Sequence, residues 1–270
     1  MNNELTVAIG GFGVIGQSVA KRLGEGMPGL RLVAVSARRK ARAEARLAEL
    51  GVSVPVLSLE DLGGVADVVV ECAPASVFMD VAGPALDAGR IFIPLSCGAL
   101  LRHEDLQARA AQSGGRIIVP TGALLGLDAV RAASEGTIHT VRMVTRKPPK
   151  GLEGAPHLIE NGIEIDNLTA PLKVYEGPAR AAAAGFPANV NVAAALSLAG
   201  VGADATHVEI WADPTVTRNT HTINVDSDAT RFEMTIEGIP SLEHPATGML
   251  TPLSVIATLR GLVSPMRVGT

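Results

Sequence analysis

Histidine is the side chain best suited to moving protons near neutral pH, because its unperturbed pKa is about 6.5. The chain has six histidines. His221 differs from the others because it ends a polar stretch, Arg218-Asn219-Thr220-His221, inside a region patterned as a strand. In an extended chain Asn219 lies on the same face as His221, where it could orient the imidazole or bind a carboxylate. A loop asparagine that satisfies its own backbone is the alternative.

A cationic segment is the second candidate for chemistry. Arg146, Lys147 and Lys150 stand close together, with a pair of prolines that stiffens the chain between them. Guanidinium and ammonium groups bind carboxylates, so this segment, and Arg218 on the same grounds, are candidates for holding an anionic substrate. A solvated charged loop fits the same pattern, and the sequence leaves both interpretations open.

A glycine-rich turn near the N-terminus is the third candidate. The pattern G-x-G-x-x-G is fitted by Gly11, Phe12, Gly13, Val14, Ile15 and Gly16. It follows a predicted strand (5–9) and opens a predicted helix (14–23), which is the context that the motif needs. The first glycine allows the tight turn, the second lets the backbone approach a pyrophosphate, and the third lets the helix sit close to the strand. We therefore expect a bound dinucleotide rather than a turn without a ligand, its pyrophosphate held at the helix N-terminus.

The end of the second predicted strand indicates which dinucleotide binds. An acidic residue there would bind the ribose 2′-hydroxyl of NAD, but the chain has Arg38 and Arg39 and no acid. Guanidinium groups suit a 2′-phosphate, so we expect NADP with NAD tolerated; a solvated first turn of the next helix is the alternative. Ala73 and Pro74 end the third strand and are expected to line the cofactor path. No Cys/His cluster has zinc spacing, so no metal is expected.

The elements that must position these residues fall into two groups. Strands expected at 5–9, 30–35, 65–71, 91–95 and 116–120 alternate with helices at 14–23, 39–50, 58–62, 77–88 and 102–112, which indicates a parallel sheet with right-handed crossovers. After residue 121 the segments 137–145, 207–212, 220–225 and 231–237 alternate like antiparallel strands. The fold class is therefore α/β: a Rossmann-type doubly wound parallel sheet with a second α+β domain carrying an open mixed sheet.

The domain boundaries follow from this change of pattern. We expect a dinucleotide-binding domain from residues 1–120 plus 245–270, with the final helix (251–262) packing back on it. Residues 121–244 would form a substrate, catalytic and dimerisation domain. An open sheet leaves an edge or a face exposed, which a second copy of the chain could cover. A homodimer is therefore expected.

Composition excludes several classes of protein. The chain has 270 residues and a net charge of −4, so no basic field points to nucleic acid. No apolar run approaches the length of a membrane span, and the N-terminus has no signal pattern. Two cysteines do not make a disulfide framework, so reduced thiols and a cytoplasmic location are expected.

Four longer stretches resemble the L-aspartate dehydrogenase family: VPTGALLGLDAVRAA (119–133), TRKPPKGL (145–152), YEGPARAAAAGFPANVNVAAALSLAG (175–200) and ADPTVTRNTHTINV (212–225). The resemblance covers essentially the whole chain and implies dimeric enzymes that reduce iminosuccinate with a nicotinamide cofactor. It implies that the backbone amide of Ala123 meets the nicotinamide end, that Asn189 is another cofactor contact, and that His221 is the catalytic histidine. Where the family feeds pyridine-nucleotide synthesis, iminosuccinate is the useful product.

Two positions depart from the family pattern. Thr121 stands where a serine is frequent, and residues 244–248 read His-Pro-Ala-Thr-Gly where an Asn-Pro-Lys-Thr-like element is common. The missing lysine leaves the exact substrate open.

We therefore expect an NAD(P)-dependent L-aspartate dehydrogenase, with His221 as acid and base and with ammonia as a co-substrate. One alternative is a reductase of a different 2-oxo or 2-imino acid on the same scaffold, which a panel of acids would separate. The other is a nucleotide-binding regulator without turnover, which would bind the cofactor and show no substrate-dependent absorbance change.

Overall fold

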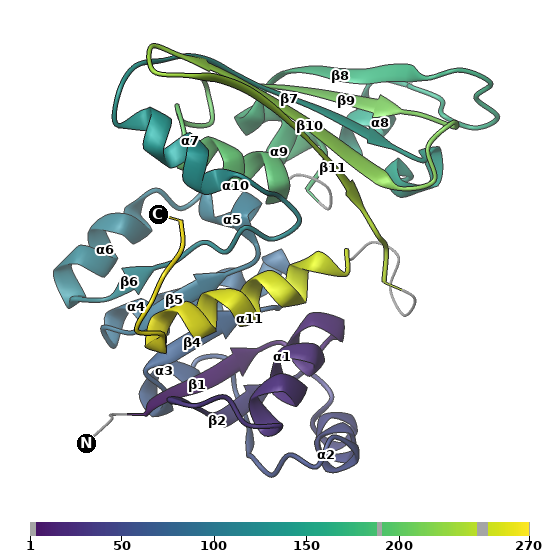
Figure 1. Cartoon of the computed structure of the whole chain (residues 1–270). Helices are drawn as coiled ribbons and strands as arrows, with labels where there is room; N and C mark the ends of the chain where they lie inside the picture. Colours follow the sequence, from purple (N-terminus) through teal and green to yellow (C-terminus); the bar gives the residue numbers. More distant parts are fainter. Residues whose placement is uncertain (1–3, 188–190, 242–247, 270) are drawn as a thin grey trace. The chain divides into compact units, whose positions relative to one another are not determined.

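The computed structural model describes residues 4–187, 191–241 and 248–269. The chain divides into two compact units, one of Met1–Pro120 with Thr251–Arg267 and one of Thr121–Leu250 with Val268–Thr270. In Figure 1 the first unit is drawn in purple to blue with its yellow C-terminal helix, and the second in teal to yellow-green. No helix among the described residues is long and apolar enough to cross a membrane.

The first unit contains a six-stranded parallel sheet in the order β3-β2-β1-β4-β5-β6. This is the order of a dinucleotide-binding sheet, with its switch point between β1 and β4. Its elements are β1 (Leu5–Gly10), α1 (Val14–Gly24), β2 (Leu30–Ser36), α2 (Lys40–Glu49), β3 (Val56–Leu57), α3 (Leu62–Val65), β4 (Val68–Glu71), η1 (Ala75–Val77), α4 (Phe78–Asp87), β5 (Ile91–Pro94), α5 (Cys97–Leu100), α6 (Asp105–Ser113), β6 (Arg116–Ile117) and α11 (Leu250–Val263).

Each face of this sheet has its own hydrophobic core. Alternate residues of a strand point to opposite faces, so Val68 and Val70 join one core and Val69 joins the other. The first core is completed by α1, α2 and α11, and the second by α3, α4, α5 and α6. Because both faces are covered, the central strands are apolar throughout. The doubly wound fold predicted from the sequence is confirmed.

The second unit contains a five-stranded mixed sheet in the order β11-β10-β7-β9-β8. Its elements are α7 (Leu127–Ser134), β7 (Ile138–Lys147), η2 (Pro149–Leu152), α8 (Pro156–Glu160), β8 (Leu172–Pro178), α9 (Ala179–Gly185), α10 (Asn191–Ala199), β9 (Thr206–Ala212), β10 (Asn219–Ser227) and β11 (Arg231–Gly238). Figure 1 shows α9 and α10 on one side of this sheet. We call the helix-covered side, which carries Val141, Ile210 and Ile223, the inner face, and the opposite side, which carries Arg142 and Thr222, the outer face.

Several predicted bounds were wrong; the strand expected at 116–120 ends at Ile117, and the helix expected at 102–112 begins at Asp105. The strand expected at 65–71 begins only at Val68, because Val65 ends α3. The helix expected at 58–62 begins only at Leu62, and Ser58 instead hydrogen-bonds Asp61 in the turn before it. The second sheet is mixed, as predicted. Its parallel pair is β7 and β9, whose alternation alone had indicated antiparallel strands, because the long connection through β8, α9 and α10 lets the chain cross over.

Candidate functional site

The glycine turn between β1 and α1 is shaped by contacts that only glycine permits. Gly11 has a φ of +102°, and a Cβ there would lie 2.5 Å from the carbonyl oxygen of Cys72. A Cβ on Gly16 would lie 2.1 Å from the carbonyl oxygen of Gly11. A Cβ on Gly13 would meet no described atom within 4 Å. Gly11 and Gly16 are therefore needed for packing, whereas Gly13 leaves open space at the start of the helix.

That open space fits a pyrophosphate. Gly13 is the N-cap residue of α1 and supplies no side-chain cap, so the first amides of the helix are available to an anion. Phe12 accepts a hydrogen bond from the Gln17 side chain, and Phe12 and Ile15 pack against the core while Val14 is half-buried. These residues form the turn that the motif requires, and their contacts with a cofactor stay predictions.

The residues expected farther along the cofactor path follow β2 and β4. Arg38 and Arg39 are exposed, and neither side chain makes an ion pair or hydrogen bond with the described residues. Ala73 is half-buried and Pro74 is exposed directly after β4. All four positions lie at the carboxyl ends of parallel strands, the edge where such sheets bind nucleotides.

Glu71 is a residue at this edge that sequence reasoning missed. It is the last residue of β4 and is 0% exposed. Its carboxylate accepts hydrogen bonds from the amides of Ala73 (2.9 Å), Ser96 (2.9 Å) and Leu95 (3.2 Å) and from the Ser96 hydroxyl (3.1 Å). A carboxylate at the end of an otherwise all-valine strand was the signal in the sequence.

In the second unit, His221 lies on the inner face of the sheet beside Thr145. The two residues are direct partners in the β10–β7 register. The imidazole Nδ1 lies 3.0 Å from Thr145 Oγ1, and the two residues are only 4% and 3% exposed. Lys147 follows two residues later on the same face of β7 and is 6% exposed. The strands thus bring a histidine, a hydroxyl and an amine together at buried positions on one face of the sheet.

Burial changes the acid–base properties of this group. Burial, with a smaller contribution from the positive charge of Lys147, lowers the pKa of His221 to about 3. Burial also lowers the pKa of Lys147 to about 8. The imidazole is therefore neutral at neutral pH, instead of titrating near 6.5 as expected from an isolated histidine. The nearby lysine remains mostly cationic at that pH.

The other predicted cations lie elsewhere. Arg146 is on the outer face, where its guanidinium lies 3.0 Å from Asp213 Oδ2 and 4.8 Å from the centre of the Trp211 ring. Lys150 is exposed in η2, and Arg218 is exposed just before β10. Of the four predicted cations, only Lys147 interacts with His221 among the described residues. Its positive charge contributes to the lowered pKa of the imidazole.

Asn219 lies on the predicted face of β10, and its role in the site stays a prediction. It is half-buried at the start of β10, paired with Gly238. Strand alternation places it on the face of His221, but the described partner of the imidazole Nδ1 is Thr145. Thr145 was missed because its position opposite His221 depends on strand register, which the sequence pattern did not specify.

The remaining predicted positions are near the start and end of the second unit. Ala123 lies in a turn closed by the hydrogen bond from the Leu124 amide to the Thr121 carbonyl, and its own amide has no partner among the described residues. Asn189 lies outside the described residues, as do residues 244–247 of the altered C-terminal segment.

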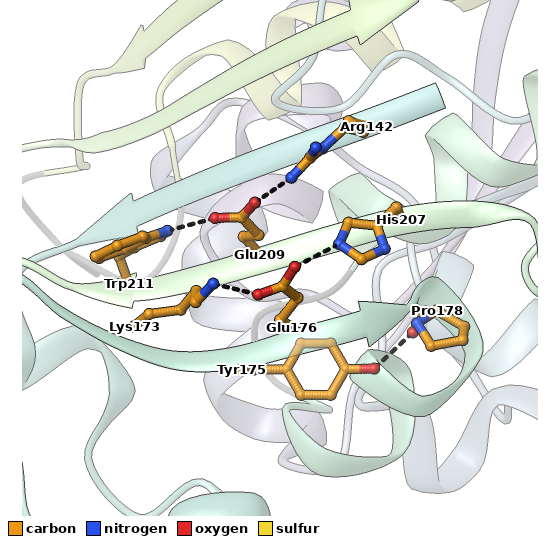
Figure 2. A network of polar contacts seen from close by, with 8 residues as sticks. All are labelled: Arg142, Lys173, Tyr175, Glu176, Pro178, His207, Glu209 and Trp211. Carbon is orange, nitrogen blue, oxygen red and sulfur yellow. Dashed lines mark hydrogen bonds and ion pairs between the residues drawn. The ribbon is translucent and has the colours of Figure 1, made fainter. Parts of the chain in front are cut away.

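A polar network lies on the outer face of the same sheet (Figure 2). Glu176, His207 and Glu209 place their ligand-type atoms within 4.8 Å of one another, a grouping that the sequence analysis did not anticipate. Both carboxylates already have cationic partners: Lys173 pairs with Glu176, and Arg142 pairs with Glu209. The exposed side chains of Lys173 and Arg142 therefore supply the positive charge that a metal ion would supply. The network is better described as a set of ion pairs.

Comparisons with known proteins agree on one family. Residues 128–262 match the family model "Aspartate dehydrogenase, C-terminal", and residues 11–120 match "Homoserine dehydrogenase, NAD binding domain". The chain is 56% identical to L-aspartate dehydrogenase 3 of Bordetella bronchiseptica, over 99% of this chain and 98% of that one. It is 55% identical to the L-aspartate dehydrogenase of Bradyrhizobium diazoefficiens, over 100% and 95%.

A solved structure shares the architecture. The crystal structure of aspartate dehydrogenase from Thermotoga maritima superposes with a TM-score of 0.74 at 28% identity, covering 98% of this chain and 99% of that one. Both units are thus matched in fold and in sequence. The chain belongs to the L-aspartate dehydrogenase family.

Proposed function

We propose that the chain interconverts L-aspartate and iminosuccinate, which equilibrates with oxaloacetate plus ammonia, using NAD or NADP. The observation that carries this proposal is the buried group of His221, Thr145 and Lys147 on one sheet face of a chain in this family. A binding module without turnover has no need for a buried neutral imidazole beside a cation.

The first unit has the backbone features that a nicotinamide dinucleotide requires. The open space at Gly13 and the uncapped N-terminus of α1 suit the pyrophosphate. Arg38 and Arg39 suit a 2′-phosphate and favour NADP over NAD. When bound, the nicotinamide ring exchanges a hydride with the substrate Cα.

His221 supplies the proton transfers. In aspartate oxidation, the neutral imidazole accepts a proton from the substrate ammonium at Nε2, because Nδ1 is held by Thr145. In imine reduction, it returns that proton to the amine nitrogen. The low pKa of His221 means that the free chain carries a neutral imidazole throughout the neutral range.

Lys147 is the proposed partner of a substrate carboxylate. Its ammonium is buried near His221, and a buried cation gains most from pairing with an anion. Lys150, Arg218 and Asn219 are proposed as further contacts for the dicarboxylate. Arg146 has a lesser claim because Asp213 and Trp211 already hold its side chain.

The decisive experiment follows reduced-nicotinamide absorbance with oxaloacetate and ammonia, using NADH and NADPH in parallel. Ammonia-dependent oxidation is expected, with loss of at least about a hundredfold in kcat for His221→Ala. His139→Ala, an exposed histidine on β7, is the matched control and should retain activity. Protein that binds a cofactor but oxidises none of it with these substrates would overturn the proposal, and turnover with another 2-oxo acid would redirect it.

The assembly and location are also proposed. The outer face carries polar side chains such as the exposed Arg142 and Thr235 and the half-buried Thr222, and we propose that a second copy covers it in a homodimer. A monomeric mass at micromolar concentration in sedimentation equilibrium would contradict this. The cytoplasm is the proposed location, since both cysteines of the chain, Cys72 and Cys97, are free thiols.

A further inference from the structure

Glu71 is a buried carboxylate that the proposed reaction does not use. Its two oxygens accept four hydrogen bonds, from the Ala73, Leu95 and Ser96 amides and from the Ser96 hydroxyl, at 2.9 to 3.2 Å. All of these donors are uncharged. Removing a carboxylate from water costs free energy, which its hydrogen bonds must offset. A carboxylate kept here without a cationic partner among the described residues therefore points to a need for those hydrogen bonds.

The donors belong to two different connections of the sheet. Ala73 lies in the segment that links β4 to η1, and Leu95 and Ser96 lie in the segment that links β5 to α5. A third connection rests on the first of these, because Gly11 packs so closely on the Cys72–Ala73 peptide that a Cβ would lie 2.7 Å from the Ala73 nitrogen. One carboxylate therefore ties together two of the three loops at the switch point and supports the third.

The groups that face this carboxylate do not carry charge at neutral pH. Burial raises the pKa of Cys72 well above its usual value, and the negative charge of Glu71 raises it further. The same two causes act on Cys97 in α5. Burial also raises the pKa of Glu71 itself, although the hydrogen bonds from Ser96, Ala73 and Leu95 oppose that shift. The ionised state of Glu71 thus depends on the loop amides.

We propose that Glu71 is a positioning residue for the cofactor site, whose ionised carboxylate fixes the loops after β4 and β5 in the arrangement that nicotinamide dinucleotide binding requires. This inference rests on the proposed function, since it assumes that NAD or NADP binds at this edge. Glu71 makes no contact with the cofactor in this role and acts through the peptides of Ala73 and Ser96.

The test compares Glu71→Gln with wild type and with Asp67→Asn. The glutamine keeps the size of the side chain but places an NH₂ group where an amide or hydroxyl donor now points. Asp67 is the matched control because its carboxylate also accepts hydrogen bonds from a neighbouring strand, from the Thr6 amide (2.9 Å) and hydroxyl (2.6 Å). It precedes β4 and so lies at the opposite edge of the same sheet.

The dissociation constant of the cofactor is measured by calorimetry between pH 5.5 and 8.5. At pH 8 we expect Glu71→Gln to bind about tenfold more weakly and to show the same rise in KM for the cofactor, with KM for oxaloacetate unchanged. Any loss of wild-type affinity at low pH that comes from protonation of Glu71 should be absent from Glu71→Gln, since burial raises the pKa of this carboxyl. Asp67→Asn should bind like wild type at every pH.

The outcomes separate the two proposals. Wild-type protein that binds neither NAD nor NADP would overturn the proposed function and this inference together. Wild-type binding with unchanged affinity and the same pH dependence in folded Glu71→Gln would overturn only the role of Glu71. If Glu71→Gln does not fold, Ser96→Ala removes one donor and should weaken binding a few-fold while keeping the pH component; wild-type affinity in that variant would overturn the role.

Discussion

Thr145 Oγ1 lies 3.0 Å from His221 Nδ1, and neither residue reaches 5% exposure. The contact joins the central strand β7 to its neighbour β10 at directly paired positions. Because one ring nitrogen is engaged by a hydroxyl, the other is oriented and chemically distinct. The backbone hydrogen bonds of the sheet thus set which nitrogen of His221 can serve the substrate.

Replacing Thr145 by valine keeps the shape of the side chain and removes its hydroxyl. The buried Nδ1 then loses its partner, so we expect kcat to fall about tenfold or more, whereas Thr145→Ser should retain most of the activity. Thr222→Val is the control, since it removes a hydroxyl from β10 on the outer face. Steady-state kinetics on the three variants check this, and equal losses in the Thr145 and Thr222 variants would contradict it.

Lys147→Met should lower the activity and raise the stability of the fold. The variant removes the buried charge, so kcat/KM for the dicarboxylate should fall at least about a hundredfold. The folded pKa of Lys147, about 8, lies below its unfolded value, so its charge destabilises the fold at neutral pH. The methionine variant should therefore resist urea better than wild type at pH 7.

The same lysine predicts a pH limit for wild-type activity. As the pH rises past about 8, the Lys147 amine loses its proton and its attraction for a carboxylate. KM for oxaloacetate should therefore increase above that pH while kcat changes less. A KM that stays flat up to pH 9.5 would exclude Lys147 as the carboxylate partner.

His221 should make the second unit sensitive to acid. Its folded pKa of about 3 is below the unfolded value of about 6.5, so only the unfolded chain takes up the proton between these values. Stability is complete above pH 6.5 and falls as the pH is lowered toward 3. Wild type should lose about 2 kcal/mol more than His221→Asn between pH 7 and pH 5. Urea unfolding followed by Trp211 fluorescence measures this difference.

Alanine substitutions at Gly16 and Gly13 should have different effects, the first on stability and the second on cofactor affinity. Gly16→Ala places a Cβ 2.1 Å from a backbone oxygen and should destabilise the first unit severely. Gly13→Ala meets no described atom within 4 Å and has a φ of −82°, so its melting temperature should match that of wild type. Its cofactor affinity should nevertheless fall about tenfold or more, because the Cβ enters the space proposed for the pyrophosphate. Normal affinity in Gly13→Ala would place the cofactor elsewhere.

The sequence pattern was most informative where an element is buried on both faces. The strands β1 and β2 and the helix α1 begin at the predicted residues and end within one residue of their predicted bounds. Their long apolar runs and the glycine motif leave few alternatives. The first strand after the domain change, β7, was also found, although it extends two residues farther to Lys147.

The pattern was least informative where tertiary contacts decide the structure. Strand β8 was not anticipated, because LKVYEGP contains glycine, proline and two charges and has no clean alternation. The strand ending at Glu71 was expected to start too early, because Val65 is as apolar as the strand that follows. Thr145 and Glu71 were missed as site residues because His221 and Ser96, which they contact, are far away in the sequence and are brought close by strand pairing.

Helix α11 contributes to the core of the first unit, so that core cannot be completed until residues 250–263 are made. Val255 and Leu259 are fully buried with Val19 and Val68 of the N-terminal segment. A nascent chain that has emerged only as far as residue 120 has α1 and α2 on this sheet face but lacks the part of the core that α11 supplies. The whole second unit must be synthesised before that face is closed, so folding on the ribosome is expected to end with the nucleotide-binding unit rather than begin with it.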